Sequence, residues 1–465
     1  MKKILLSLCV LILSSTIVLS GCSLFGTGDV TVNNNTFNLT DEQWSEYLDK
    51  ISVSGDSAEQ LKAAANYSLL SGVSVITSFT YKTTGYRKVG DNYGAIGERT
   101  YSAAYCGSGV IVELDGESDT AYVLTNAHVI YSDSSNEVFS NDVRLYLYGQ
   151  DAEHVNYSLS SKYVTYNYTY VYYAQGNEYK EMISTTVTDD EKYRIDASVV
   201  AASLRYDIAL LKVSANDILE KNPYAVAAKF ADEEDVTVGD RVYTVGNPGG
   251  DGMSVTAGIV NKTSETVSLS ISDDENTGNY NDYRVIRTDA SINAGNSGGG
   301  LFNLNGKLIG VINAKKKGGE IDNMGYALPA CNVKRLWLLL KDGYLGGNTF
   351  GKNNFGVTRA YLSAVYEAVW TCPEIDITAG GIVSDVVETV AVTKSGGNLQ
   401  SGDVIKNVSI ISFSGETIDS ISVKRAYHVD DVLLSLRSGG KVIVTVDRNG
   451  TEIEVEASCT TKKVA

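Results

Sequence analysis

The sequence predicts a mainly β-protein with more than one domain, whose larger part is an antiparallel barrel or sandwich. Short runs of β-branched and aromatic residues, separated by turn residues, dominate the chain after residue 70. The chain has 465 residues, which is more than one hydrophobic core usually organises. A glycine-rich linker over 343–352 divides the larger unit from a smaller one that has strands and one helix.

The expected elements follow in order along the chain. Residues 57–70 favour one helix, and a closing helix is expected over 333–341, where Val333, Leu336 and Leu340 recur at helical spacing. The strands expected in the larger unit are 73–80, 109–113, 121–125, 143–148, 208–213, 241–245, 283–288 and 307–313. In the smaller unit, the one helix is expected over 429–436.

The N-terminus has the pattern of an export signal. Two lysines precede an apolar stretch over 4–19, which is too short for a typical spanning helix. It ends in Leu19-Ser20-Gly21-Cys22, which resembles the lipobox of bacterial lipoproteins. We therefore expect a signal peptide over 1–21, a lipid on Cys22, and a tether with the N-terminal helix over 22–65. This places the protein outside the cytoplasm, anchored to a bacterial membrane; the alternative is a secretory leader with an incidental cysteine.

Charge and cysteine content exclude several classes. The formal net charge is −17, and such a surface repels phosphate backbones, so nucleic acid is not expected as a partner. Four cysteines remain beyond Cys22, with no CxxC pair, so neither a metal nor a cofactor is expected. These four are Cys106, Cys331, Cys372 and Cys459. They are either buried free thiols or, in an oxidising compartment, include a Cys372–Cys459 disulfide.

A serine set among glycines is the first sign of chemistry. Ser297 lies in Gly295-Asn296-Ser297-Gly298-Gly299, where glycines allow a sharp turn that directs amides into one small volume beside the hydroxyl. The backbone of Gly295, Asn296 and Ser297 is the expected oxyanion hole, with the amides of Gly295 and Ser297 as donors.

Two further residues, His128 and Asp207, lie next to predicted strands, where they could form a catalytic group with Ser297. His128 follows an apolar strand, and as general base it would take the Ser297 proton. Asp207 directly precedes the apolar run 208–213 and would orient the imidazole. His154 and His428 lie in polar surroundings and are expected at the surface.

Together these segments resemble the HtrA/DegP family of extracytoplasmic serine proteases. His128, Asp207 and Ser297 occur in the chain order of chymotrypsin-like proteases, and further matching strings are Gly246-Asn247-Pro248-Gly249 and Gly325-Tyr326-Ala327-Leu328-Pro329. The resemblance covers roughly residues 70–460. It implies an all-β protease domain over 66–342, with a chymotrypsin-like double six-stranded β-barrel, no need for ATP, and assembly into a homo-oligomer such as a trimer.

One segment departs from the family pattern. His128 and Asp207 are 79 residues apart, and the surplus at about 148–192 is rich in tyrosine. Its alternating polar and aromatic residues predict an extra hairpin, either a surface decoration or a flap that binds a partner. The expected substrate pocket, formed by Ser291, Asn313 and Ala314, offers no negative charge and by resemblance suits a small aliphatic side chain.

Residues 353–460 resemble a PDZ domain, an α+β fold. Phe355, Gly356 and Val357 match the loop that receives a peptide C-terminus, and the bound peptide would extend a sheet edge. The alternative is a rigid cap with a degenerate groove.

The expected function is a membrane-anchored serine endopeptidase that cleaves unfolded or misfolded proteins. Two alternatives are a sensor protease that cuts one membrane protein and a chaperone-like peptide-binding scaffold.

Overall fold

The computed structural model describes residues 57–132, 138–140, 142–150, 158–232, 236–270, 280–315, 324–345, 359–371, 375–376, 381–382 and 387–462. The chain forms two compact units, Met1–Trp44 and Ser45–Ala465, and all of these residues belong to the second. The expected signal peptide and Cys22 lie outside the described residues. Within the described ranges, no helix is long and apolar enough to cross a membrane.

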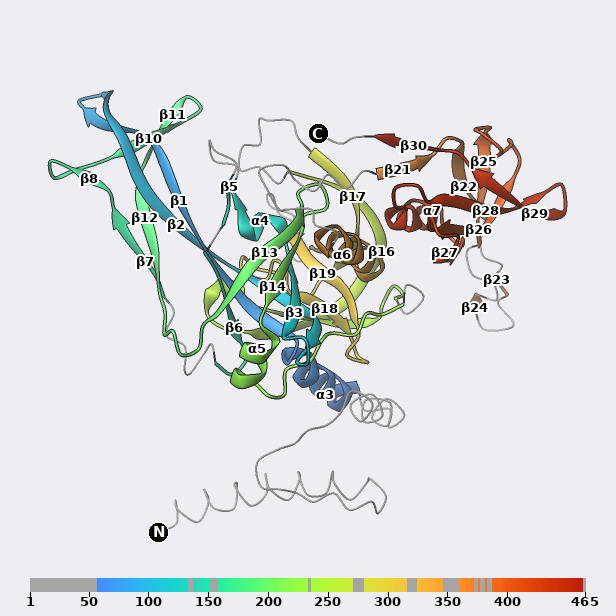
Figure 1. Cartoon of the computed structure of the whole chain (residues 1–465), viewed down its shortest axis with the longest axis horizontal. Coiled ribbons are helices and arrows are strands. Elements are labelled where there is room, and N and C mark those ends of the chain that lie inside the picture. Colours follow the sequence, from blue (N-terminus) through green and yellow to red (C-terminus); the bar gives the residue numbers. More distant parts are fainter. Residues whose placement is uncertain are drawn as a thin grey trace, which may run out of the picture. The chain divides into compact units, whose positions relative to one another are not determined.

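Six antiparallel strands close a first barrel (Figure 1). In spatial order they are β1 (Gly72–Val89), β2 (Asn92–Asp115), β3 (Thr120–Thr125), β14 (Ile208–Val213), β13 (Ile195–Ser203) and β6 (Asp142–Leu147). The barrel closes because Val73 of β1 pairs with Gly109 on one side and with Leu147 of β6 on the other. Its interior is filled by buried aliphatic side chains such as Ile111 and Leu211.

A second six-stranded barrel follows in the chain. Its strands, in spatial order, are β15 (Arg241–Gly246), β16 (Ser254–Ser270), β17 (Tyr280–Thr288), β20 (Gly325–Pro329), β19 (Leu308–Lys315) and β18 (Gly300–Asn303). β18 pairs back to β15, and Val242, Ile286 and Leu301 are among its buried core residues. The two barrels confirm the double six-stranded fold that the resemblance implied.

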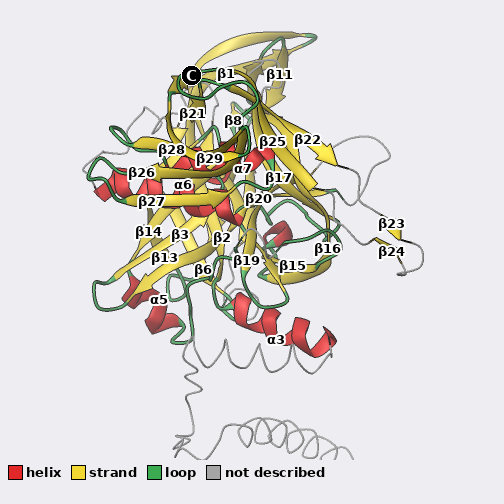
Figure 2. Cartoon of the chain, turned by 90° about the vertical axis from the view of Figure 1, so that its right-hand side faces the viewer, coloured by secondary structure: helices red, strands yellow, loops and turns green. Residues whose placement is uncertain are grey.

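Helices are few and short beside the strands (Figure 2). Those in the described ranges are α3 (Ser57–Leu69), α4 (Ala127–Ile130), α5 (Ala215–Lys221), α6 (Ala330–Leu345), α7 (Ala426–Val432) and the 3₁₀ turns η2 (Pro248–Gly250) and η4 (Leu433–Ser435). The helix expected over 333–341 is therefore confirmed, and it extends further at both ends. Its apolar face, with Val333, Leu336 and Leu340, is buried as its spacing predicted.

The insertion is more elaborate than the single hairpin predicted. Its strands are β7 (Ser158–Tyr163), β8 (Thr165–Tyr166), β9 (Thr169–Tyr170), β10 (Tyr172–Gln175), β11 (Glu178–Glu181) and β12 (Ile183–Thr188). They form three pairs, β7 with β12, β8 with β9, and β10 with β11, and β10 also pairs with β1. The pairs meet at Val164, Val171 and Met182, whose backbones hydrogen-bond in a ring at 2.7–3.1 Å. Figure 1 shows these strands beside the outer ends of β1 and β2. A short pair, β4 (Tyr131–Ser132) with β5 (Val138–Phe139), precedes them.

The C-terminal sheet, which we define as the strands within 359–462, has its own apolar core. Its strands are β21 (Arg359–Leu362), β22 (Val365–Thr371), β25 (Val387–Lys394), β26 (Val404–Ile411), β27 (Thr417–Ser422), β28 (Lys441–Arg448), β29 (Thr451–Ala457) and β30 (Cys459–Lys462). The small pair β23 (Ile375–Asp376) and β24 (Gly381–Ile382) lies between β22 and β25 in the chain. The helix expected over 429–436 is α7 with η4. Residues 343–345 of the expected linker 343–352 belong to α6, and the rest of it, with Phe355, Gly356 and Val357, lies outside the described residues.

His428 contradicts its predicted surface position. The residue is only 6% exposed, because it lies on the inner face of α7. Its Nδ1 lies 3.1 Å from the Ser422 carbonyl oxygen and accepts from the Lys424 amide at 3.2 Å. The burial of His428 could not be predicted, because its neighbours in sequence are polar and a seven-residue helix has too few turns to show a clear apolar pattern. Cys106, Cys331 and Cys459 are half-buried thiols, of which Cys331 accepts a hydrogen bond from Arg284 at 3.1 Å, and Cys372 lies outside the described residues.

Candidate active site

His128 and Asp207 form a close pair at the edge of the first barrel. Nδ1 of His128 lies 2.7 Å from Oδ2 of Asp207, and the backbone amide of His128 donates to Oδ1 at 2.9 Å. The carboxylate thus holds the same residue at two points, which fixes the orientation of the ring. The side chain of Asp207 is 5% exposed, whereas that of His128 is 36% exposed and accessible to a substrate.

Neighbouring strands bring the pair together. His128 follows β3 in α4, and Asp207 precedes β14, which pairs with β3 through Ala209 and Thr125. Asp207 adopts a left-handed backbone with φ of 49°, a conformation that Asp tolerates better than most residues. The side-chain amide of Asn126 donates to its carbonyl at 2.8 Å and holds this turn.

Ser297 lies half-buried on the loop that leads from β17 into β18 of the second barrel. The backbone conformation and the close neighbours of the two flanking positions allow only glycine there. Gly295 and Gly298 have φ of 98° and 86°, and a Cβ on either would lie 2.1 Å from a carbonyl oxygen, that of Asn247 or of Ser108. Only glycine permits this conformation and this close approach.

The Ser297 loop packs against the segment that carries His128. The Ser297 carbonyl accepts from the Ser108 amide at 2.8 Å, and a Cβ on Gly298 would lie 2.4 Å from Oγ1 of Thr125. Gly107 sits between the two sides, since a Cβ there would lie 2.7 Å from Val129 and 3.3 Å from the Ser297 carbonyl oxygen. The Ser297 loop and the segment that carries His128 therefore pack against each other across the two barrels.

The backbone amides around Ser297 fall into two groups, those that hydrogen-bond within the fold and those that could donate to an oxyanion. The Asn296 amide donates to the Asn293 carbonyl at 3.0 Å within a turn, so it is engaged in the loop itself. The Gly298 amide donates to Ile312 of β19 at 2.8 Å. The amides of Gly295 and Ser297 remain the candidate donors to a developing oxyanion.

The three residues predicted to line a substrate pocket lie in different places. Ser291 is exposed, and its carbonyl accepts from Oγ1 of Thr256 at 2.8 Å. Ala314 lies on β19, paired with Tyr326. Asn313 is 3% exposed and lies beneath Asp207, to whose Oδ2 its amide donates at 2.5 Å. Asn313 thus supports the carboxylate.

Sequence reasoning missed Ser108. Its hydroxyl donates to the Gly295 carbonyl at 2.6 Å and accepts from the Asn247 amide at 2.7 Å, so it ties the serine loop to a neighbouring loop. The signal was present as Gly107-Ser108-Gly109, a serine between glycines at the start of an apolar run. Among the described residues, no cluster of three or more His, Cys, Asp or Glu is placed to hold a metal ion.

Comparison with known proteins agrees with this geometry. The family model of the trypsin-like peptidase domain matches residues 107–311. A probable periplasmic DegP-like serine endoprotease of Chlamydia trachomatis is 30% identical over 284 residues, 60% of this chain and 49% of that protein. The periplasmic serine endoprotease DegP of Escherichia coli is 31% identical over 277 residues, 59% of this chain and 50% of that protein.

The chain spans about half the length of these curated relatives. Among solved structures, the HtrA-type protease AlgW with a decapeptide overlaps 86% of this chain and 98% of its own, at 21% identity and a TM-score of 0.40. The family match and the curated relatives agree on the type of protease. Residues 107–311 therefore match the trypsin-like peptidase domain, and over about 60% of its length the chain is similar to DegP-type serine endoproteases.

Proposed function

We propose that this chain is a serine endopeptidase in which Ser297 is the nucleophile, His128 the general base and Asp207 the residue that orients the base. The single observation that carries the proposal is the His128–Asp207 pair beside the Ser297 loop, with the carboxylate buried and the imidazole accessible. Because Nδ1 faces the carboxylate, it carries the ring proton and Nε2 carries the lone pair.

The reaction follows from these assignments. Oγ of Ser297 forms a bond to the scissile carbonyl carbon while Nε2 of His128 takes its proton. The amides of Gly295 and Ser297 donate to the resulting oxyanion, and each such donor contributes about 2.7–4 kcal/mol to lowering the barrier. The imidazolium then protonates the leaving amine, and water, deprotonated by His128, releases the acyl group.

Two features support a location outside the cytoplasm. The N-terminal pattern ending in Cys22 favours lipid attachment at a bacterial membrane, outside the cytoplasm. The curated relatives are described as periplasmic. We propose that the substrates are unfolded or misfolded polypeptides, that residues 353–460 bind peptide C-termini as a PDZ domain does, and that the protein works as a homo-oligomer such as a trimer.

A casein digest with purified protein tests the activity. The wild-type chain is expected to cut casein, and the Ser297→Ala variant is expected to leave it intact while retaining the same unfolding temperature. Cleavage that persists in Ser297→Ala would rule out this nucleophile. No cleavage of casein or of other unfolded chains by the wild type would favour a peptide-binding scaffold.

A further inference from the structure

The Asp207 carboxylate has a second support that comes from the other barrel. Its Oδ2 accepts from Nδ1 of His128 at 2.7 Å and from Nδ2 of Asn313 at 2.5 Å. A buried carboxylate needs several donors to offset its lost hydration, and hydrogen bonds to an ionised group are the stronger ones. Asn313 is therefore part of what holds this charge in place.

Tyr283 determines which end of the Asn313 amide faces Asp207. Its hydroxyl donates to Oδ1 of Asn313 at 2.9 Å, so the NH₂ group is left to point at the carboxylate. The opposite orientation would place an amide oxygen against a carboxylate oxygen. Burial, and then the charge of Asp207, raises the pKa of Tyr283 well above its ordinary value, so the phenol stays protonated and remains a donor.

The same part of β19 also holds the serine loop. Ile312, next to Asn313, accepts from the Gly298 amide and donates to the Gly299 carbonyl, both at 2.8 Å. Two adjacent residues of β19 thus hydrogen-bond different parts of the site: Ile312 bonds the Ser297 loop, and Asn313 bonds the carboxylate of Asp207. Because Asp207 belongs to the first barrel and Tyr283 and Asn313 to the second, these contacts set the acid relative to the serine across the two barrels.

We propose that Tyr283 is a positioning residue for the protease reaction, acting through Asn313 on Asp207 and hence on the His128 ring. This inference rests on the proposed function, because it assigns a role in the same site. It predicts that the Tyr283 hydroxyl affects the chemical step without touching the substrate.

The test uses the full chain and a fluorophosphonate probe. Asn313→Ala is expected to lower the limiting labelling rate by about tenfold to a hundredfold, as loss of a hydrogen bond to a charged group implies. Tyr283→Phe, which removes one hydroxyl, is expected to lower it by about three- to tenfold. The probe concentration at half-saturation should stay unchanged in both variants, because both side chains are buried.

A proton NMR spectrum gives a readout that does not depend on activity. The low-field resonance of the His128 Nδ1 proton should move upfield in both variants, since the carboxylate that holds it is less well placed. Tyr243→Phe is the matched control. Tyr243 lies in the same barrel as Tyr283, its buried hydroxyl hydrogen-bonds Ser68 of α3 at 2.8 Å, and loss of this hydroxyl should change neither the rate nor the resonance.

The outcomes are separable. A Tyr283→Phe variant with the wild-type rate and the wild-type resonance overturns the inference, even if Asn313→Ala fails to fold. A wild-type chain that the probe does not label refutes the proposed function instead, and the NMR comparison then decides the hydrogen-bond chain by itself. A changed rate together with a shifted resonance in Tyr283→Phe, absent in Tyr243→Phe, supports the positioning role.

Discussion

Ser108 shows how a single buried hydroxyl can organise a catalytic loop. It makes hydrogen bonds to Gly295 and to Asn247, and its amide holds the Ser297 carbonyl. Ser108 is fully buried, so water cannot replace either bond when the hydroxyl is removed. The shape of the oxyanion loop therefore depends on a residue that need not touch the substrate.

We expect Ser108→Ala to destabilise the fold and to slow labelling of Ser297. A buried polar group left without its partner costs about 1–3 kcal/mol, and here a carbonyl and an amide are both affected. Thermal unfolding and fluorophosphonate labelling measure the two effects. Ser74→Ala is the matched control, because Ser74 is the cross-strand neighbour of Ser108 and its buried hydroxyl has no hydrogen-bond partner among the described residues. Equal unfolding temperatures for the two variants would contradict this role.

Several site residues could be predicted from the sequence because their chemistry is local. A serine between glycines, a histidine after an apolar strand and an aspartate before one each show in a few neighbouring residues. The hydrogen bonds of Asn313 could not be predicted, because its partners, Asp207 and Tyr283, are distant in sequence. Asn313 is buried beneath Asp207 because of the way the two barrels pack together, and the residue pattern within β19 does not predict that packing.

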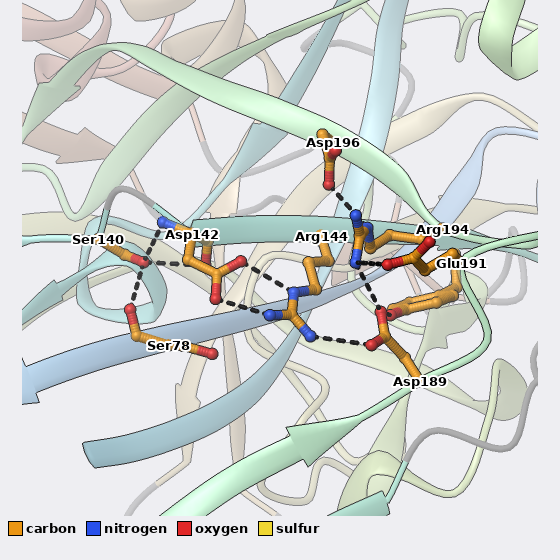
Figure 3. Close-up of polar contacts among 9 residues, drawn as sticks. Ser78, Ser140, Asp142, Arg144, Asp189, Glu191, Arg194 and Asp196 are labelled. Carbon is orange, nitrogen blue, oxygen red and sulfur yellow. Dashed lines mark hydrogen bonds and ion pairs between the residues drawn. The ribbon is translucent and has the colours of Figure 1, made fainter. Parts of the chain in front are cut away.

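Among the elements, the insertion is held by a cluster of ion pairs at its C-terminal end (Figure 3). Arg144 of β6 bonds Asp142 at 2.8 Å and Asp189 at 3.0 Å, and the Tyr146 hydroxyl donates to Asp189 at 2.6 Å. Burial, and then the contact with Asp189, raises the pKa of Tyr146, so it remains a donor. Asp189 thus ties the end of the inserted strands to the first barrel.

Asp189→Ala is expected to loosen the insertion. Removing a mostly buried carboxylate that accepts from both Arg144 and Tyr146 should cost about 2 kcal/mol. Hydrogen exchange should rise over 158–188, and the thermal unfolding temperature should fall. The control is Asp196→Ala, whose pair with Arg194 involves a side chain that is 74% exposed and is worth little. If exchange over 158–188 is the same in both variants, Asp189 is not the anchor.

The sequence predicted that the insertion consists of β-strands, but it did not predict how many hairpins they form. Alternating polar and aromatic residues predicted strands correctly. The number of hairpins could not be inferred, because Val171 and Met182, the buried contacts that join them, stand singly among exposed residues. The barrel strands were easier, since each carries an apolar run that must face a core.

In the molecule as a whole, ion pairs link the second barrel to helix α7 and helix α6 to strand β27 of the C-terminal sheet. Arg284 contacts Asp431 at 2.5 Å, and Arg335 of α6 donates to Asp419 at 2.7 Å. Burial opposes ionisation of Asp419, but the hydrogen bonds from Arg335 and Ser435 prevail and hold its pKa below the ordinary value. A carboxyl with a lowered folded-state pKa stabilises the folded state above its unfolded pKa of about 3.9.

This contribution should be complete above about pH 4 and should be lost as the pH falls through the lowered pKa of Asp419. Asp419→Asn is expected to unfold at a lower temperature than the wild type at neutral pH, and the difference should shrink in acid. Glu456→Gln is the control, because its pair with Lys441 is more than half exposed. A temperature difference between Asp419→Asn and wild type that stays constant down to pH 2 would contradict the assignment.

The reaction assigned to this chain depends on a base that activates Ser297, and the decisive measurement is fluorophosphonate labelling followed by mass spectrometry of the labelled peptide. We expect the wild type to be labelled on Ser297, and His128→Ala to be labelled about 10²- to 10⁴-fold more slowly, as loss of a general base implies. Labelling of His128→Ala at the wild-type rate, or a label on another serine, would contradict the assignment.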